Sequence, residues 1–451
     1  MSGLIRSISG VRGIVDTDLT AEVVARYAAA FGRIAPEGGG ETVVLARDSR
    51  TSGPMFAAAA RGALQSVGID VIDCGLIATP TAQLAVEHHQ AAGGIIISAS
   101  HNPVEWNALK FVGPDGLFLD WASANRLFEL VDTGSTAGMG GKGLGTLTTD
   151  ADAVRRHVEG VLGLPFVDLD AIRARGFTVA LDCVRGAGGT ILPELLERLG
   201  CRVVGIDLET DGCFTRSPEP VPANLSRLQE LVRNEAADVG MAVDPDVDRL
   251  ALVAEGGEAI GEDYTLAFAV RAVLDRRLGP VAVNLSTSQV VEDVAAEFGV
   301  EVTRAPVGEA NVARAMVRVR AVIGGEGNGG VMLPDLHLGR DAPVAAALVL
   351  DLLARTGKTV GGLTAAQRRY VIVKAKAPRA ADLEQAYQAL EERFGDAAPD
   401  RQDGLRLSWS DQWLHIRPSG TEPIVRLIAE APDAAAADRL IAAGRAILER
   451  E

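Results

Sequence analysis

The chain has 451 residues, of which 47% are hydrophobic, 23% are charged and only 4% are aromatic. At roughly 150 residues per domain this length predicts three or four domains, and the composition excludes disordered and fibrous proteins. Sixty acidic residues against 44 basic ones give a formal net charge of -16. The averaged field therefore repels nucleic acids and anionic membranes, and we expect neither as a partner. An anionic ligand would need a local cluster of Arg, Lys and backbone N–H groups.

Apolar runs and cysteine spacing favour a cytoplasmic protein. The longest uninterrupted apolar run, Ala342 to Leu350, is far shorter than the ~20 residues that a bilayer span needs. Residues 1–13 contain no apolar core of the ~7–15 residues typical of a secretion signal. The cysteines lie far apart without a C-x-x-C pair, which favours buried thiols in a reducing compartment over disulfides or a zinc site. They are Cys74, Cys183, Cys201 and Cys213.

A strand, a helix, a glycine and a second strand follow one another three times, in residues 42–72, 178–204 and 281–302. Each first strand is short and apolar, each helix is apolar-periodic, and each second strand alternates in polarity. This order is typical of β-α-β units, which build largely parallel sheets covered by helices. We expect three related α/β domains, although the similarity could reflect only the shared β-α-β architecture.

Composition also predicts the domain boundaries. Residues 134–145 are rich in glycine with Ser and Thr, as in a flexible linker. After residue 370 the pattern changes to a strand, a helix, two strands and a final helix, which predicts a small α+β domain. The predicted fold class is α/β, with three related mixed-sheet α/β domains and a smaller C-terminal α+β domain. The predicted ranges are 1–147, 148–252, 253–367 and 368–451.

Two polar loops of the first domain carry candidate functional residues. Arg12 lies on a glycine-flanked N-terminal loop. Residues 94–97 form an all-apolar strand, typical of burial on both faces, and Ser100, His101 and Asn102 follow its carboxyl end, where ligands bind in α/β sheets. A nucleophilic or phosphate-accepting serine is one interpretation. Ser, Asn and Pro also form turns, and the local sequence favours neither interpretation.

Lys110 ends a second short apolar stretch, ten residues after Ser100. A hairpin-like return of the chain would bring its ammonium group back toward Ser100. An acyl-transfer pair of Ser100 and His101 is disfavoured, because the chain has no G-x-S-x-G elbow and adjacent residues of an extended chain point apart.

Asp244, Asp246 and Asp248 follow an apolar strand at every second position. Three clustered carboxylates are costly unless a cation lies between them, which favours a hard divalent metal over a solvated acidic loop. A calcium-binding EF-hand is disfavoured, since Arg249 stands where that loop needs glycine. Magnesium is therefore the predicted metal, and Arg249 would add a fork for a phosphate group.

A glycine-rich segment, residues 324–330, follows another apolar strand. It matches G-x-G-x-x-G, but no helix follows that could bind a pyrophosphate, so dinucleotide binding is disfavoured. We predict a tight loop that presents Glu326 and Asn328 to the hydroxyl groups of a sugar.

Between two strands of the last domain, residues 417–423 combine Arg417, the hydroxyls of Ser419 and Thr421, and the backbone N–H of Gly420. Such a set can cradle an anion, with Arg426 one strand turn away. The alternative is a simple Pro/Gly/Ser turn.

Together these motifs resemble the α-D-phosphohexomutase superfamily, which comprises phosphoglucomutase, phosphomannomutase and phosphoglucosamine mutase. The resemblance extends over the whole chain and is specific, because the motifs occur in the expected order. They are residues 9–13, 99–103, 244–249, 325–326 and 417–423.

The resemblance implies four domains around a central cleft and a serine-linked phosphoryl transfer. Ser100 would carry the phosphoryl group, and one Mg²⁺ per chain would bridge it to Asp244, Asp246 and Asp248. A hexose phosphate would be the substrate, and hexose 1,6-bisphosphate the bound intermediate and activator. Arg12, His101, Lys110 and Arg249 would assist the transfer. The implied substrate-binding residues are Asn102, Glu326, Asn328, Arg417, Ser419, Gly420, Thr421 and Arg426.

One departure from the family concerns proton transfer. Many members have His where this chain has Gly330, and we hypothesise that His337 or Lys110 takes over that role, with His337 placed among the substrate-binding residues. The sugar loop and Gly420 look most like the archaeal-type phosphoglucosamine mutases, and the alternative is a phosphomannomutase/phosphoglucomutase of broad specificity.

Proteins of other classes are also compatible with parts of the pattern. They are a Mg²⁺-dependent sugar phosphatase and a non-catalytic sugar-phosphate sensor. The second phosphate cradle at Arg417 favours the mutase, because a mutase must hold both phosphates and exclude water. We expect a monomer or a homodimer.

Overall fold

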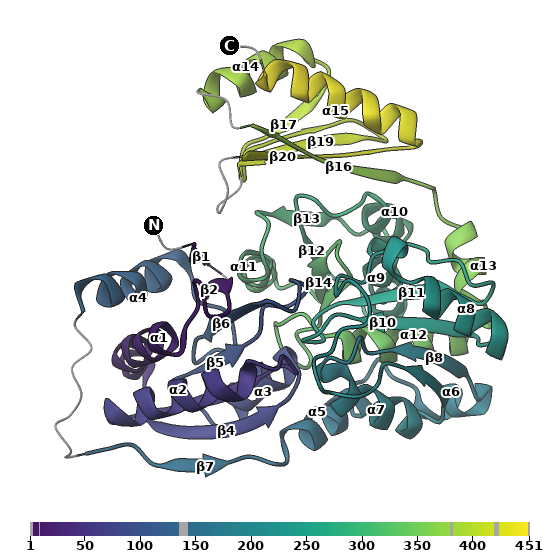
Figure 1. Cartoon of the computed structure of the whole chain (residues 1–451). Coiled ribbons are helices and arrows are strands. Elements are labelled where there is room, and N and C mark those ends of the chain that lie inside the picture. Colours follow the sequence, from purple (N-terminus) through teal and green to yellow (C-terminus); the bar gives the residue numbers. More distant parts are fainter. Residues whose placement is uncertain (1–2, 9, 135–142, 379–381, 419–423, 450–451) are drawn as a thin grey trace.

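The computed structural model describes residues 3–8, 10–134, 143–378, 382–418 and 424–449. They form four sheets with covering helices, which we call domains I to IV in chain order (Figure 1). The sheets of domains I to III mix parallel and antiparallel strands, whereas every pair in domain IV is antiparallel. This is the predicted fold class. No helix among the described residues is long and apolar enough to cross a bilayer.

Domain I holds a seven-stranded sheet with the order β1-β2-β6-β5-β3-β4-β7. Helix α1 begins where the Thr20 side chain accepts the Val23 N–H, and α4 begins at Asp120 and ends at Gly134 in the left-handed conformation. Strand β7 starts at the predicted domain boundary and still pairs with β4. The elements are β1 (Ile5–Ser7), β2 (Gly10–Ile14), α1 (Ala21–Ile34), η1 (Ala35–Gly38), β3 (Thr42–Arg47), α2 (Gly53–Ser66), β4 (Asp70–Leu76), α3 (Thr79–His88), β5 (Gly93–Ile97), β6 (Trp106–Val112), α4 (Trp121–Thr133) and β7 (Leu147–Thr149).

Domain II holds a four-stranded sheet with the order β11-β10-β8-β9. Strand β10 is wholly buried, as expected for the all-apolar strand that precedes the aspartates. The elements are α5 (Ala153–Leu162), α6 (Leu169–Arg175), β8 (Thr178–Asp182), η2 (Ala187–Thr190), α7 (Leu192–Arg198), β9 (Arg202–Ile206), η3 (Pro222–Asn224), α8 (Ser226–Glu235), β10 (Val239–Val243) and β11 (Leu250–Ala254).

Domain III repeats this sheet with the order β13-β12-β14-β15. Its helix α12 begins at Asp341, whose side chain accepts the Val344 N–H. The elements are α9 (Asp263–Leu274), β12 (Val281–Asn284), α10 (Val290–Glu297), β13 (Val302–Ala305), α11 (Glu309–Val319), β14 (Ile323–Glu326), β15 (Gly330–Met332), α12 (Ala342–Thr356) and α13 (Val360–Ala365).

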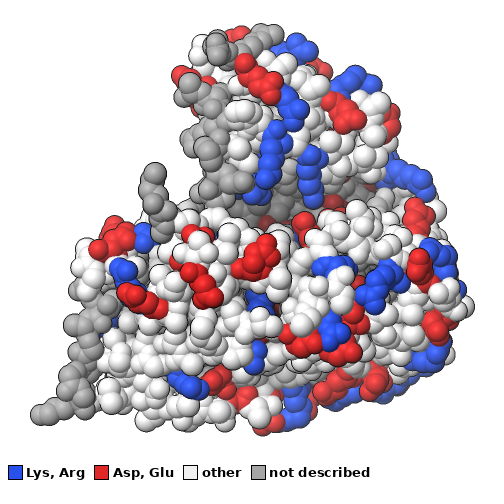
Figure 2. All heavy atoms as spheres, viewed as in Figure 1, with Lys and Arg blue, Asp and Glu red and all other residues white. Residues whose placement is uncertain are grey.

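Domain IV holds an antiparallel sheet with the order β16-β20-β19-β18-β17. Helices α14 and α15 lie on its outer side in Figure 1, and the opposite side of the sheet faces the other domains. A hollow separates much of domain IV from the rest of the protein, with basic side chains on its domain IV side (Figure 2). The elements are β16 (Val371–Pro378), α14 (Leu383–Arg393), β17 (Ala398–Asp400), β18 (Leu405–Ser408), β19 (Trp413–Pro418), β20 (Ile424–Ala431) and α15 (Ala434–Leu448).

Strand order supports the prediction of three related α/β domains. Four consecutive strands of the first sheet, β6-β5-β3-β4, have the same order and directions as β11-β10-β8-β9 and β15-β14-β12-β13. In each set a central strand is flanked by two strands that run parallel to it. The fourth strand pairs antiparallel with one of these two flanking strands. The resemblance extends beyond the β-α-β units seen in the sequence.

The cores do not divide as simply as the sheets. One continuous hydrophobic cluster contains buried residues of both domain II and domain III. Helix α12 belongs to it and is buried from Ala342 to Leu353, because it is apolar on all sides. Domains II and III thus share a core. Cys213 is exposed rather than buried, unlike the other three cysteines.

Candidate active site

The three motif-bearing loops of domains I to III occupy equivalent positions. Each loop leads into the antiparallel strand of its sheet: residues 98–105 lead into β6, 244–249 into β11 and 327–329 into β15. The loops also meet in space, since Ser100 Oγ of the first loop donates to Asp244 Oδ2 of the second, and the Leu250 N–H at the end of the second donates to the Gly329 carbonyl of the third. One site is therefore assembled from three copies of the same structural position.

Arg50 holds the Ser100 loop in shape. Its guanidinium is fully buried and pairs through Nε with Asp48. Ser100 has a φ of 48°, in the left-handed region that non-glycine residues seldom adopt, and its N–H donates to Ser98 Oγ. Such a conformation persists only where neighbours enforce it. The remaining Arg50 donors bind the carbonyl oxygens of Ser100, Asn102, Pro103 and Trp106 at 2.6 to 2.8 Å.

Ser100 faces the aspartate cluster. Its Oγ donates to Asp244 Oδ2 at 2.8 Å and lies 3.4 Å from His101 Nδ1. The charge of Arg249, followed by burial, lowers the pKa of His101 well below its ordinary value. His101 is therefore neutral near pH 7 and can exchange a hydrogen bond with Ser100.

The aspartates form a buried carboxylate cluster that fits a divalent cation. One oxygen from each of Asp244, Asp246 and Asp248 lies within 4.8 Å of the others. Burial, reinforced by the two neighbouring carboxylates, raises the pKa of Asp244 well above its ordinary value. Asp246 Oδ1 and Asp248 Oδ1 are buried without a hydrogen-bond partner. Such oxygens suit Mg²⁺, which prefers hard oxygen ligands and an octahedral shell.

Cations from domains I and II lie beside this cluster. The predicted hairpin is present, since Lys110 pairs with Ile96 across β5 and β6 and its Nζ lies 2.6 Å from Asp246 Oδ2. Burial raises the pKa of Asp246, but the charge and hydrogen bond of Lys110, together with hydrogen bonds from Thr79 and Asp244, leave it below its ordinary value. Arg249 Nε lies 3.6 Å from Asp248 Oδ1. The serine and the carboxylates thus lie in a pocket of positive charge that suits a phosphate.

Glu326 and Asn328 lie where the sequence predicts, but Glu326 ends strand β14 instead of standing in a loop. Its Oε1 accepts from Asn284 and the Gly308 N–H, and its Oε2 accepts from Arg340 at 2.8 Å. Burial raises the pKa of Glu326, but the charge of Arg340 and the hydrogen bonds from Asn284 and the Gly308 N–H together lower it below its ordinary value. The carboxylate is therefore ionised and fixed.

His337 does not join the groups around Ser100. Its Nδ1 accepts the Gly339 N–H and its Nε2 lies 2.9 Å from Asp341 Oδ2. His157 Nε2 approaches the same oxygen at 2.8 Å, and its Nδ1 bonds Thr81. Since both nitrogens of His337 are hydrogen bonded inside the protein, its placement gives no support to the suggested role in proton transfer or substrate binding. The alternative, Lys110, does lie at the cluster.

Domain IV contributes basic residues that are neighbours across its sheet. Arg417 on β19 and Arg426 on β20 are cross-strand neighbours, and Lys376 on β16 lies on the other side of Arg426. Burial and the charges of Arg249 and Arg426 lower the pKa of Arg12, which donates to Asn102 Oδ1 at 3.1 Å. Arginines far apart in the sequence therefore act on one another electrostatically. Ser419, Gly420 and Thr421 lie outside the described residues.

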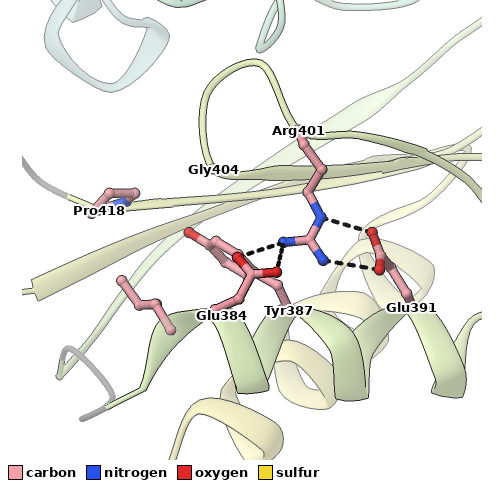
Figure 3. Close-up of a pocket in the computed structure, with 7 residues that line it drawn as sticks. Glu384, Tyr387, Glu391, Arg401, Gly404 and Pro418 are labelled. Atoms are coloured by element: carbon pink, nitrogen blue, oxygen red, sulfur yellow. Dashed lines mark hydrogen bonds and ion pairs between the residues drawn. The ribbon is translucent and has the colours of Figure 1, made fainter.

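A pocket in domain IV lies apart from this chemistry (Figure 3). It lies between α14 and the sheet, near Pro418. Arg401 crosses it and is neutralised by Glu391, at 2.8 and 2.9 Å, and by Glu384 at 3.3 Å. Two carboxylates against one guanidinium make this pocket unfavourable for a phosphate.

Several residues at the site were not expected from the sequence. Thr79 Oγ1 donates to Asp246 Oδ2 at 2.6 Å, and Arg340 donates to Asp248, Glu326 and Glu309. Neither lies in a motif. In the sequence, Thr79 only follows the strand Asp70–Leu76 and Arg340 only precedes an apolar helix. Neither position indicates which side chain the residue would bind.

The site combines a serine hydroxyl, a carboxylate cluster that can hold a divalent cation, and several nearby arginines. This combination defines a phosphotransferase. Comparison with known proteins identifies its family. Models of the phosphoglucomutase/phosphomannomutase α/β/α domains I, II and III match residues 4–137, 155–257 and 261–370, and that of the C-terminal domain matches residues 370–446. The chain belongs to the phosphoglucomutase/phosphomannomutase family. The predicted superfamily and enzyme class are thereby confirmed.

Relatives cover nearly the whole chain. A phosphoglucomutase/phosphomannomutase of Thermococcus kodakarensis is 36% identical over 450 residues, which cover 98% of this chain and 97% of the relative. A probable phosphoglucosamine mutase of Methanopyrus kandleri is 36% identical over 428 residues, 94% of this chain and 93% of the relative. A crystal structure of a phosphoglucomutase/phosphomannomutase family protein from Burkholderia thailandensis superposes with a TM-score of 0.86 at 26% identity, covering 99% of this chain and 98% of that one.

Proposed function

We propose that the chain interconverts hexose 1-phosphates and hexose 6-phosphates, with Ser100 as the phosphoryl carrier and hexose 1,6-bisphosphate as the bound intermediate. The observation that carries this proposal is the 2.8 Å contact from Ser100 Oγ to Asp244 Oδ2. It places the serine hydroxyl at the edge of the carboxylate cluster, where a phosphoryl group on Oγ could share a cation with the aspartates.

One Mg²⁺ per chain would be held by Asp244, Asp246, Asp248 and the phosphorylated Ser100. When bound, it would neutralise charge on the phosphoryl oxygens during transfer. The two buried Oδ1 atoms without hydrogen-bond partners support this assignment. Burial is the main cause of the raised pKa of Asp244, and the same charge neutralisation would relieve the repulsion from Asp248 and Asp246 that adds to it.

The chain's own residues would position the phosphates. A free hydroxyl of the sugar attacks the phosphorus on Ser100, the bond from phosphorus to Oγ breaks, and the hydroxyl proton passes to a neighbouring base. The neutral His101, 3.4 Å from Ser100 Oγ, could accept it. Lys110 is a poor acceptor, because burial lowers its pKa but Asp246 and Asp248 together raise it, so its ammonium group keeps its proton. The bisphosphate then turns over, and Ser100 Oγ takes the other phosphoryl group. Arg12, Arg249 and His101 would face the transferring group, and Asn102 orients Arg12. Arg417, Arg426 and the segment with Ser419, Gly420 and Thr421 would hold the phosphate that is not transferred.

Glucosamine phosphate is the proposed preferred substrate, and broad activity on glucose and mannose phosphates is the alternative. Both rest on resemblance, since relatives carry both names. Glu326 and Asn328 would contact the ring hydroxyls. Buried free thiols support a reducing, cytoplasmic location, and a monomer or homodimer stays a prediction.

The test supplies the enzyme with Mg²⁺, a trace of hexose 1,6-bisphosphate and glucosamine, glucose or mannose 1-phosphate. We expect 6-phosphate to form, fastest from glucosamine 1-phosphate, and Ser100→Ala to lose nearly all turnover. Asp170→Asn is a folding control, because Asp170 lies on the exposed start of α6. Release of free sugar and inorganic phosphate without 6-phosphate would establish the phosphatase instead. Full activity of Ser100→Ala would exclude the phosphoserine.

A further inference from the structure

The side chain of Arg340 occupies the space next to Gly330 in domain III. A Cβ atom added to Gly330 would lie 2.3 Å from Arg340 Cδ and 2.9 Å from Arg340 Cγ, closer than two carbon atoms can approach. Gly330 has no unusual backbone angle, so what excludes a larger residue is the arginine stem. The absence of a side chain at position 330 therefore makes room for the side chain of Arg340.

Within this space the Arg340 guanidinium binds three carboxylates from separate elements. Nε lies 2.9 Å from Glu309 Oε2 at the start of α11, and Nη1 lies 2.8 Å from Glu326 Oε2 at the end of β14. Nη2 donates to Asp248 Oδ2 in the metal loop of domain II. The side chain is 9% exposed. Its planar fork fixes the directions of all three bonds at once, which a lysine ammonium cannot do.

The bond to Asp248 leaves the second oxygen of that carboxylate for other partners. Oδ2 is held by Arg340, whereas Oδ1 is buried without a hydrogen-bond partner. The adjacent Asp341 anchors this part of the chain, because its carboxylate caps α12 and accepts from two buried histidines. Arg340 is thereby held in place both by the anchored backbone next to it and by its three carboxylate partners.

We propose that Arg340 is a positioning residue that sets the spacing between the metal ligand Asp248 and the sugar-recognition residue Glu326. The sugar side of this proposal rests on the proposed function. The metal side does not, because it concerns only the orientation of Asp248. Partners that orient a metal ligand typically account for 10- to 100-fold in metal affinity.

Arg340→Lys tests the proposal, since it keeps the positive charge and removes the fork. We expect calorimetric titration with MnCl₂ or MgCl₂, in the absence of sugar, to show an affinity about tenfold weaker than wild type, with KM for the hexose phosphate also raised. The matched control is Arg355→Lys, whose partner Asp351 is buried in the shared core of domains II and III. It should bind the metal within about twofold of wild type. Wild-type metal affinity in Arg340→Lys would overturn the proposal.

Gly330→Ala provides a second test that leaves every polar partner in place. The new methyl group would displace the arginine stem, so we expect the same loss of metal affinity. The control is Gly62→Ala, because a Cβ there meets nothing within 4 Å. Unchanged metal binding in Gly330→Ala would also overturn the proposal. If the wild-type enzyme lacks mutase activity but both variants weaken metal binding, the proposed function fails and the role of Arg340 toward Asp248 stands.

Discussion

Ser100 Oγ lies 2.8 Å from Asp244 Oδ2, although 144 positions separate them in the chain. The contact joins the equivalent loops of domains I and II, and the bond from the Thr79 N–H to the Asp246 carbonyl fixes the same interface through the backbone. Neither domain alone contains the site. The geometry of the site therefore depends on how the domains pack against each other.

Removing the divalent cation should lower the stability of the folded chain. Without it, three buried carboxylates repel one another, and two of their oxygens have no hydrogen-bond partner. At about 100 times its Kd, Mg²⁺ should add about 2.7 kcal/mol to the free energy of unfolding. Thermal melts after chelation and after Mg²⁺ is restored measure the effect. Asp246→Asn should lose the Mg²⁺-dependent shift in Tm, whereas Asp170→Asn, on the exposed start of α6, should keep it. A shift of equal size in both variants would contradict the assignment.

Arg50→Lys should disorder the Ser100 loop. Lysine cannot supply the directed donors that serve four carbonyl oxygens and Asp48, so we expect a loss of about 2–4 kcal/mol in stability and little phosphorylation of Ser100. Chemical denaturation and phosphate transfer from labelled hexose 1,6-bisphosphate measure the two effects. Arg304→Lys is the matched control, as Arg304 is also a buried arginine that binds loop carbonyls. Arg304→Lys should lose stability, but its Ser100 should still be phosphorylated. An equal loss of Ser100 phosphorylation in both variants would count against a specific role of Arg50.

Arg426→Ala should weaken substrate binding more than turnover. Arg426 is exposed on β20, next to Arg417, and its charge already acts on Arg12. Loss of one charge-assisted phosphate contact should raise KM by about 10- to 100-fold. Steady-state kinetics tests this, with Arg439→Ala on helix α15 as the control that keeps KM. An unchanged KM in Arg426→Ala would remove it from the phosphate cradle.

Acid should loosen the contact between domains III and IV. His415 is buried there, with Nδ1 2.8 Å from Ser286 Oγ and Nε2 2.7 Å from the Asp403 carbonyl oxygen. Burial lowers the pKa of His415 from 6.5 to about 4, despite an opposing effect of Asp403. Because the unfolded chain takes up this proton first, the stabilising contribution is complete above about pH 6.5. It should fall by up to about 3 kcal/mol as the pH drops toward 4.

Hydrogen exchange in β19 between pH 7.5 and 4.5 measures this effect, after correction for intrinsic exchange rates. Protection should decline with falling pH in the wild type and change less in His415→Gln. The exposed His88→Gln serves as the control and should behave as the wild type. The same pH dependence in all three proteins would exclude His415 as its source.

Local sequence patterns were sufficient to predict most of the helices and strands and the central residues of the site. The all-apolar strand before Ser100 and the alternate aspartates after β10 predicted a buried strand end and a metal loop, because buried parallel strands and clustered carboxylates are constrained by chemistry within a few residues. The resemblance of five motifs in order then predicted the family. By contrast, His337 was singled out only because it lies close to Gly330 in sequence, and its ring instead bonds Asp341.

The sequence by itself determined the four-domain α/β organisation, the cationic residues and the carboxylates, which depend on composition, periodicity and short spacings. Only the tertiary structure decided which charges meet. The chain has a net charge of -16, yet it forms a local basic region, because Arg12 and Lys110 of domain I, Arg249 of domain II and Arg426 of domain IV lie near one another in the folded protein. Arg340 lies beside Asp248 because Gly330 leaves the space and because domains II and III share one core. Contacts between groups so distant in sequence depend on packing, which no local pattern encodes.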